Sequence, residues 1–124
     1  MSESGNFYRD SVLSGIEPIN TLYESEQVIA FEHTRPSYTT HYVVIPKSEV
    51  DSLLDLPTDG DLLRELILAI QHVARDVMNL HGKCRVVTNL GEYQDSKHLH
   101  WHVISADRID TANSRRSSCR EAKK

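Results

Sequence analysis

The sequence predicts an α+β fold: a five-stranded, mainly antiparallel sheet with one long and one short helix. Short apolar segments bounded by turn residues recur on both sides of one amphipathic stretch, in the order β-β-β-α-β-β. Most links between neighbouring strands are of hairpin length, which favours antiparallel pairing. The chain has 124 residues, enough for one domain with its own core and too few for two.

Three strands are expected before the long helix. Residues 15–18 predict a turn, and the apolar segments 21–23 and 28–31, joined by a polar link, predict a hairpin. Residues 42–45 form a continuous apolar run that ends at a proline, which is typical of a buried central strand. His41 would then stand at the mouth of that strand.

The helical segments follow. Apolar residues in 50–56 predict one or two helical turns before a proline. Residues 62–80 carry an apolar stripe at helical spacing with charged residues opposite, so they predict the long helix that covers the sheet. Thr58 or Asp59 is expected to cap its start, and Gly82 to end it in a left-handed conformation.

The remaining strands are expected at 85–89 and 98–104, joined by a loop at 90–97. We assign residues 1–108 to a single domain. Residues 109–124 are polar and basic, with little apolar content, so we expect a flexible tail.

Composition bounds the function. The formal net charge of −4 disfavours extended binding to a nucleic-acid backbone, which needs several basic residues on one face. No stretch approaches the length of a membrane span or resembles a signal peptide, which favours a cytoplasmic protein. Cys84 and Cys119 are isolated thiols rather than a disulfide framework or a metal-binding pair, so we expect both to be reduced.

Three histidines alternate with apolar residues in the segment His98-Leu99-His100-Trp101-His102. On a strand, the imidazoles would share one face while Leu99 and Trp101 pack on the other. Three imidazoles on one face could bind a metal, or they could act as a nucleophile with supporting acid and base groups. Ordinary half-exposed strand residues are the third interpretation, and the strict alternation disfavours it.

The pattern of residues 98–104 resembles the signature of the histidine triad (HIT) family of nucleotide-binding hydrolases and transferases. The resemblance extends beyond this segment. Residues 31–47 are similar to that family's Phe…Pro…Thr-His…Val-Ile-Pro-Lys segment, and residues 86–91 to its Asn-x-Gly strand end. Gln94 stands four residues before the first triad histidine, as the family's glutamine does, and residues 7–18 resemble the opening of its small single-domain branch.

The resemblance implies a five-stranded antiparallel sheet, a homodimer formed through the long helix and an edge strand, and a purine nucleotide or nucleotide conjugate as ligand. It implies hydrolysis of nucleoside phosphoramidates or related phosphoanhydrides and esters through a nucleotidyl-histidine intermediate. His100 would be the nucleophile, with its second nitrogen held by a backbone carbonyl, and His98 and His102 would assist it. The implied substrate-binding residues are Phe31, His33, Thr34, His41, Asn89, Gln94 and Ser96. No cofactor is implied, although a divalent ion could accompany a polyphosphate substrate.

Two positions depart from the family pattern. His33 stands where the small branch usually has an acidic residue that holds the ribose hydroxyls, so the sugar preference is expected to differ. Asp95 stands where a serine usually assists the leaving group, in a shortened loop, with Ser96 one step later. A carboxylate repels phosphate, so either Asp95 turns outward or the leaving group is cationic.

Two alternatives to the hydrolase therefore stay open. The first is a nucleotide-binding or scaffold protein with weakened catalysis, which the departures at His33 and Asp95 favour. The second is a mononuclear zinc protein built on His98, His100 and His102. Alternate strand residues lie about 7 Å apart, which makes a tetrahedral site awkward, so zinc is the least favoured alternative.

Overall fold

The computed structural model describes residues 8–15 and 18–108, and the fold is the predicted α+β class. Five antiparallel strands form one sheet in the order β1-β2-β3-β5-β4. The strands are β1 (Thr21–Glu24), β2 (Val28–Glu32), β3 (Tyr38–Pro46), β4 (Arg85–Thr88) and β5 (Trp101–Arg108). The long helix is α1 (Leu62–His81), and three short turns are η2 (Tyr8–Leu13), η3 (Leu53–Asp55) and η4 (Gly91–Tyr93). The predicted tail at 109–124, with Cys119, lies outside the described residues.

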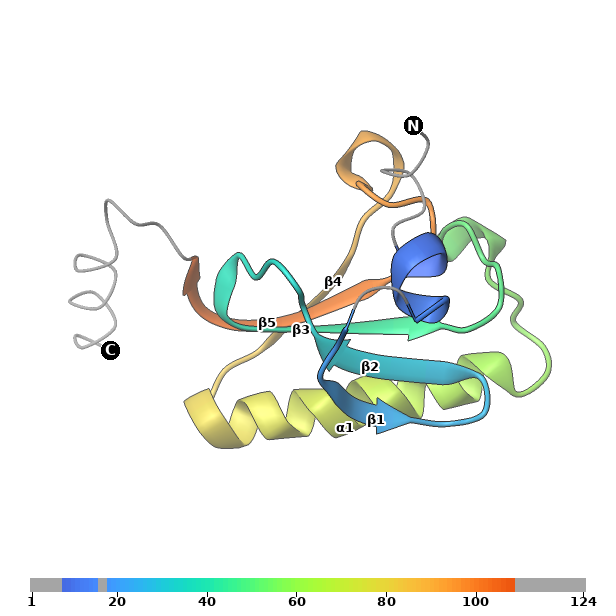
Figure 1. Ribbon diagram of the computed structural model, residues 1–124. Helices are drawn as coiled ribbons and strands as arrows, with labels where there is room; N and C mark the ends of the chain where they lie inside the picture. Colours follow the sequence, from blue (N-terminus) through green and yellow to red (C-terminus); the bar gives the residue numbers. More distant parts are fainter. Residues whose placement is uncertain (1–7, 16–17, 109–124) are drawn as a thin grey trace.

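The sheet is covered differently on its two faces. In Figure 1, α1 runs along one face and η2, drawn in blue, lies on the other. Alternate residues of the strands divide between two cores because a strand's side chains point to opposite faces. The core under α1 includes Ala30, Val44 and Val103. The opposite core includes Phe31 and Val43, and it is the face on which the triad histidines lie.

Helix α1 begins and ends close to the predicted positions. Its apolar stripe is buried against the sheet, as its spacing predicts. The predicted caps Thr58 and Asp59 are wrong: Asp61 stands at the cap position, and its side chain makes no capping hydrogen bond. Gly82 ends the helix with φ of 76°, as expected, and its N–H donates to the carbonyl of Met78.

The last strand begins later than the sequence predicts. β5 starts at Trp101, so His98 and His100 lie in the segment that precedes the strand. This segment leaves the sheet because the Leu99 N–H donates to the carbonyl of Val50, which is outside any strand, at 2.7 Å. The predicted alternation is nevertheless confirmed, since Leu99 packs in the core under α1 while the histidines face the opposite side.

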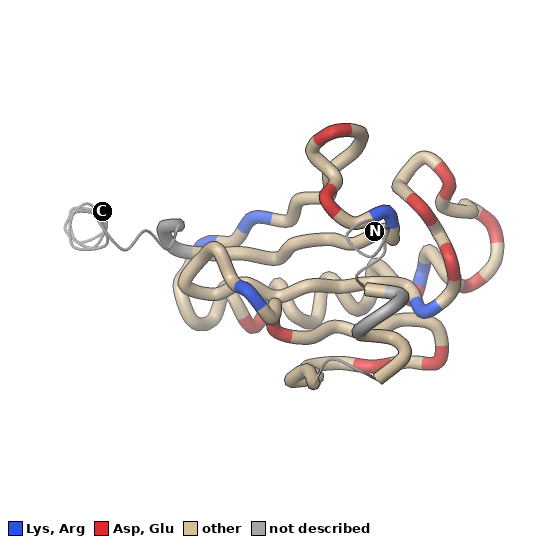
Figure 2. The backbone as a smooth tube through the Cα atoms, turned by 45° about the horizontal axis from the view of Figure 1, so that its top comes forward, with Lys and Arg blue, Asp and Glu red and all other residues tan. Residues whose placement is uncertain are grey.

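Charge is unevenly spread. Residues 49–61, which lead into α1, carry five carboxylates, and Figure 2 shows acidic positions gathered on these loops while basic positions stand singly along the chain. No helix in the described part of the chain is long and apolar enough to cross a membrane. The homodimer stays a prediction.

Candidate active site

The site lies on the sheet face opposite α1, where β3 and β5 run side by side. Val43 on β3 pairs with His102 on β5, which brings His41 next to His102. The ring centres of His41 and His102 are 5.0 Å apart, and those of His100 and His102 are 4.9 Å apart. His33, in the loop after β2, adds a fourth ring 4.3 Å from that of His41. The fold therefore gathers four imidazoles, two of them from the triad.

His100 is held in one tautomer by the backbone. Its Nδ1–H donates to the carbonyl of His98 at 2.7 Å, as the resemblance implies for the nucleophile. A neutral imidazole has one N–H, so Nε2 keeps its lone pair. The side chain is 3% exposed, and this burial lowers its pKa, although the carboxylate of Asp95 opposes the shift. His100 thus presents a neutral, unprotonated Nε2, the state that a nucleophile requires.

His98 anchors the segment. Its Nε2–H donates to the carbonyl of Pro46 at 2.7 Å, and the side chain is 2% exposed. This hydrogen bond holds the segment 98–100 against Pro46, the last residue of β3. His98 therefore acts on His100 through its own backbone carbonyl, and its ring is occupied by Pro46.

His41 and His102 form a hydrogen-bonded pair with a defined direction. The Ser37 N–H donates to His41 Nδ1 at 2.9 Å, so the proton of a neutral His41 ring is on Nε2. That Nε2–H donates to His102 Nδ1 at 2.8 Å. His102 consequently carries its proton on Nε2, beside the ring of His100. The pair therefore places one N–H donor on the ring that neighbours His100.

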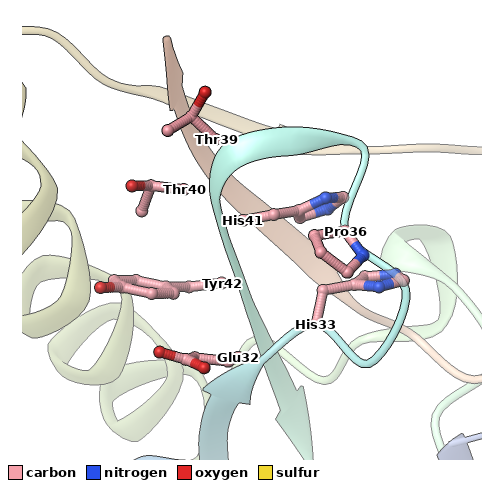
Figure 3. A pocket seen from close by; sticks show the side chains of 7 residues that line it. All are labelled: Glu32, His33, Pro36, Thr39, Thr40, His41 and Tyr42. Carbon is pink, nitrogen blue, oxygen red and sulfur yellow. The ribbon is translucent and has the colours of Figure 1, made fainter. Parts of the chain in front are cut away.

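A backbone N–H also sets the tautomer of His33. The Arg35 N–H donates to His33 Nδ1 at 2.9 Å, so Nε2 of His33 carries the proton. Figure 3 shows the His33 and His41 rings on the same side of β3, whereas Glu32, Thr40 and Tyr42 project to the other side. Glu32 lines a small hollow of about 150 Å³ that His33 and His41 also line, and it does not line the larger pocket described next. It therefore brings no carboxylate to that pocket in place of His33.

A larger pocket of about 380 Å³ opens beside the imidazoles. Its lining includes His33, Arg35, His41, His102, Asn89 and Asp95. Asn89 directly follows β4, and its role as a binding residue stays a prediction. Asp95 lines the pocket too, although the residue is exposed.

The other expected binding residues lie apart from this pocket. Gln94 is buried, and its Nε2–H₂ donates to the carbonyl of Asp51 at 2.6 Å, so it fastens the loop before the triad to the loop before η3. Ser96 is also buried, and Thr34 is half-buried between His33 and Arg35. Phe31 lies fully buried in the core beneath the site.

Tyr8 is a site residue that the sequence did not reveal. Its ring centre is 4.6 Å from that of His100 and 6.0 Å from that of Phe31, and the side chain is 4% exposed. Burial and the charge of Asp95 raise the pKa of its hydroxyl. Tyr8 follows a polar terminus with no periodic pattern, so only the folded chain shows that η2 covers His100.

We expect Tyr8→Ala to expose His100 and raise the pKa of its imidazole towards the ordinary value, because burial is the largest cause of the depression. The lost ring should also lower the free energy of unfolding by about 3 kcal/mol. NMR titration of the His100 ring, with urea unfolding, measures both. Tyr8→Phe keeps the ring and should change neither much; an unchanged His100 pKa in Tyr8→Ala would contradict the covering role.

Three of the four imidazoles also form a candidate metal site. One ring nitrogen each of His33, His41 and His102 lie within 4.8 Å of one another, a set that differs from the triad on which the zinc alternative rested. A metal-bound histidine uses one lone pair and normally donates its other N–H to an acceptor. In His33 and His41, a backbone N–H occupies the Nδ1 lone pair and Nε2 carries the proton. Neither ring has a free lone pair, so this donor set does not fit a metal ion.

Burial and mutual repulsion keep the four imidazoles neutral. Burial, with the neighbouring rings His33, His102 and His100, lowers the pKa of His41 to about 3. Burial, with His100 and His33, lowers the pKa of His102 to about 4. The pKa of His33 is also lowered, chiefly by burial and then by His100.

These depressed pKa values predict a loss of stability in mild acid. Unfolded histidines take up protons near pH 6.5, while folded His41 and His102 do not, so the free energy of unfolding should fall between pH 6.5 and about 4. Each ring contributes at most about 1.4 kcal/mol per pH unit.

Urea unfolding at a series of pH values measures this slope. His102→Gln removes one of the rings whose pKa is lowered by burial and should flatten the slope below pH 6.5. Equal slopes in wild type and His102→Gln would refute the assignment.

Comparison with known proteins identifies the family. The family model of the HIT domain matches residues 15–109. The chain belongs to the HIT domain family. It is 30% identical to the protein HitA of Neisseria gonorrhoeae over 89 residues, which cover 70% of this chain and 83% of HitA.

Two solved structures of HIT proteins share the fold. A HIT family hydrolase from Clostridium thermocellum superposes with a TM-score of 0.68 at 26% identity, covering 82% of this chain and 89% of that one. A hypothetical histidine triad nucleotide-binding protein from Sulfolobus tokodaii superposes with a TM-score of 0.67 at 28% identity, covering 81% of this chain and 70% of that one.

Proposed function

We propose that this HIT protein is a nucleotide-binding hydrolase that cleaves purine nucleoside phosphoramidates, or related nucleotidyl phosphoanhydrides and esters, through a nucleotidyl-His100 intermediate. The observation that carries the proposal is the fixed tautomer of His100, whose Nδ1–H is held by the His98 carbonyl and whose Nε2 lone pair is free. The names of two similar structures, a hydrolase and a nucleotide-binding protein, support the same class.

The reaction needs two displacements at phosphorus. In the first, His100 Nε2 forms a bond to phosphorus while the bond from phosphorus to the leaving nitrogen breaks, and that nitrogen takes up a proton and leaves as an amine. In the second, water attacks phosphorus, the bond to Nε2 breaks, and the water gives up a proton. The sum is one water consumed and one nucleoside monophosphate and one amine formed.

The neighbouring groups divide the remaining work. The Nε2–H of His102 donates to a phosphate oxygen next to His100, and the hydrogen bond from His41 holds it in that tautomer. Asn89 offers an amide donor from the other side of the pocket. The carboxylate of Asp95 favours a leaving group that departs as a cation, which is why an amine is the preferred leaving group.

Rapid acid quench followed by intact-protein mass spectrometry tests the proposal. Wild type mixed with a fluorogenic adenosine phosphoramidate should gain the mass of one adenylyl group, and fragmentation of the peptide with the triad should place it on His100. The adduct should decay as product appears. Product release without any adduct, or an adduct on another histidine, would overturn the proposed mechanism.

A nucleotide-binding protein with little turnover is the second candidate, and one observation favours it. Tyr8 covers His100, leaving the nucleophile 3% exposed. Saturable AMP binding with neither adduct nor product in the same quench experiment would establish this alternative.

A further inference from the structure

The lining of the large pocket includes one negative side chain, Asp95, and one positive side chain, Arg35. Asp95 is close enough to His100 and Tyr8 to act on the pKa of both, in each case after burial as the larger cause. Arg35 acts on His33, where burial again comes first. The negative group of the pocket is therefore associated with the nucleophile, and its positive group with His33.

His33 presents a hydrogen-bond donor to this pocket. Its Nδ1 lone pair is used by the Arg35 N–H, so Nε2 carries the only proton of the neutral ring. The ring lies over that of His41 at 4.3 Å with the planes inclined by 32°, which holds its orientation. Among the described residues, no acceptor is found for the Nε2–H of His33.

The donor lies one ring beyond the reacting centre. The ring centres of His100 and His102 are 4.9 Å apart, and those of His102 and His33 are 5.9 Å apart. A phosphate at His100 Nε2 would meet the Nε2–H of His102. An adjacent anionic group of the same substrate would meet the Nε2–H of His33 and the guanidinium of Arg35. An N–H donor next to a guanidinium suits phosphate, whereas a vicinal diol is better held by a carboxylate.

We propose that His33 and Arg35 form a second phosphate subsite, so that this protein prefers nucleotides with a phosphate beyond the one that reacts at His100. The inference rests on the proposed function and names its substrate class. The second phosphate would come from either of two sources, the sugar of the nucleotide or its polyphosphate chain. Both present the same dianionic group to the subsite.

Isothermal titration calorimetry with AMP, ADP and adenosine 3′,5′-bisphosphate tests the subsite without requiring turnover. Wild type should bind ADP or the bisphosphate about tenfold more tightly than AMP, the size expected of one additional charge-assisted contact. Whichever of the two compounds binds more tightly than AMP identifies the source of the second phosphate. Arg35→Gln should bind AMP and the nucleotide with a second phosphate with about equal affinity. Arg75→Gln, on the exposed face of α1, should keep the preference of wild type.

Two substitutions of similar size at His33 test whether its N–H donor is what binds the second phosphate. Asparagine can donate and aspartate cannot, so His33→Asn should keep part of the preference and His33→Asp should abolish or reverse it. His33 is half-buried in the loop after β2, and circular dichroism checks that both variants are folded. Equal affinity of wild type for all three nucleotides, or a preference that survives both His33→Asp and Arg35→Gln, would overturn the subsite alone. Absence of AMP binding together with absence of an adduct would overturn the proposed function as well.

Discussion

Replacing His100 by alanine is expected to lower turnover of an adenosine phosphoramidate by about 10⁴-fold or more, because the variant has no group to form the covalent intermediate. No other ring at the site replaces it. His98 is engaged with the Pro46 carbonyl, and the backbone and His41 fix His102 with its proton on Nε2, so neither matches the free Nε2 that His100 presents. Steady-state release of the fluorogenic amine measures the loss.

Folding has to be separated from chemistry in this variant. His100 packs against Tyr8, so alanine leaves a cavity, and His100→Gln is the variant closer in volume. Both should unfold cooperatively in urea and both should be inactive. His72→Ala, on the exposed face of α1, should retain full activity. Turnover by folded His100→Gln within tenfold of wild type would exclude His100 as the nucleophile.

The fold was predictable because its signals are local. The stripe in 62–80 has the period of a helix, and the alternation from Leu99 to Val103 has the period of a strand. In the structure, the helical stripe packs in the core on one face of the sheet, and alternate strand residues divide between that core and the core on the opposite face. The start of β5 was not predictable in the same way, since it depends on the hydrogen bond between Leu99 and Val50, residues far apart in the sequence.

The site was predictable only in part. The triad and His41 are visible as a spaced motif, and the structure brings His41, His100 and His102 together. The roles of Gln94 and His98 depend on which carbonyl each reaches, Asp51 and Pro46 respectively, and no local pattern encodes that partner.

The tautomers were equally hidden from the sequence. Backbone amides of Ser37 and Arg35 set the protons of His41 and His33, and those amides point inward only because the loop after β2 folds back on β3. Composition therefore identifies a histidine-rich site, while donor and acceptor roles come from the loop. The distinction decides the chemistry, since the same rings with free lone pairs would suit a metal ion.

Replacing His98 by alanine is expected to reduce the free energy of unfolding by about 2–4 kcal/mol, since it opens a cavity and leaves the buried Pro46 carbonyl without its donor. Activity should fall with it, because the carbonyl of residue 98 orients Nδ1 of His100 and the segment would be less firmly held. Urea unfolding and steady-state kinetics measure both effects.

A conservative variant separates anchoring from proton transfer by His98. Glutamine carries an amide donor that can reach the Pro46 carbonyl but has no titratable ring. If His98 only anchors the segment, His98→Gln should recover most of the stability and most of kcat. Leu99→Ala is the matched packing control, since Leu99 is equally buried but faces the core under α1. It should lose comparable stability while keeping kcat at temperatures where it is folded. A well-folded His98→Gln as inactive as His100→Ala would show instead that the His98 imidazole takes part in the chemistry.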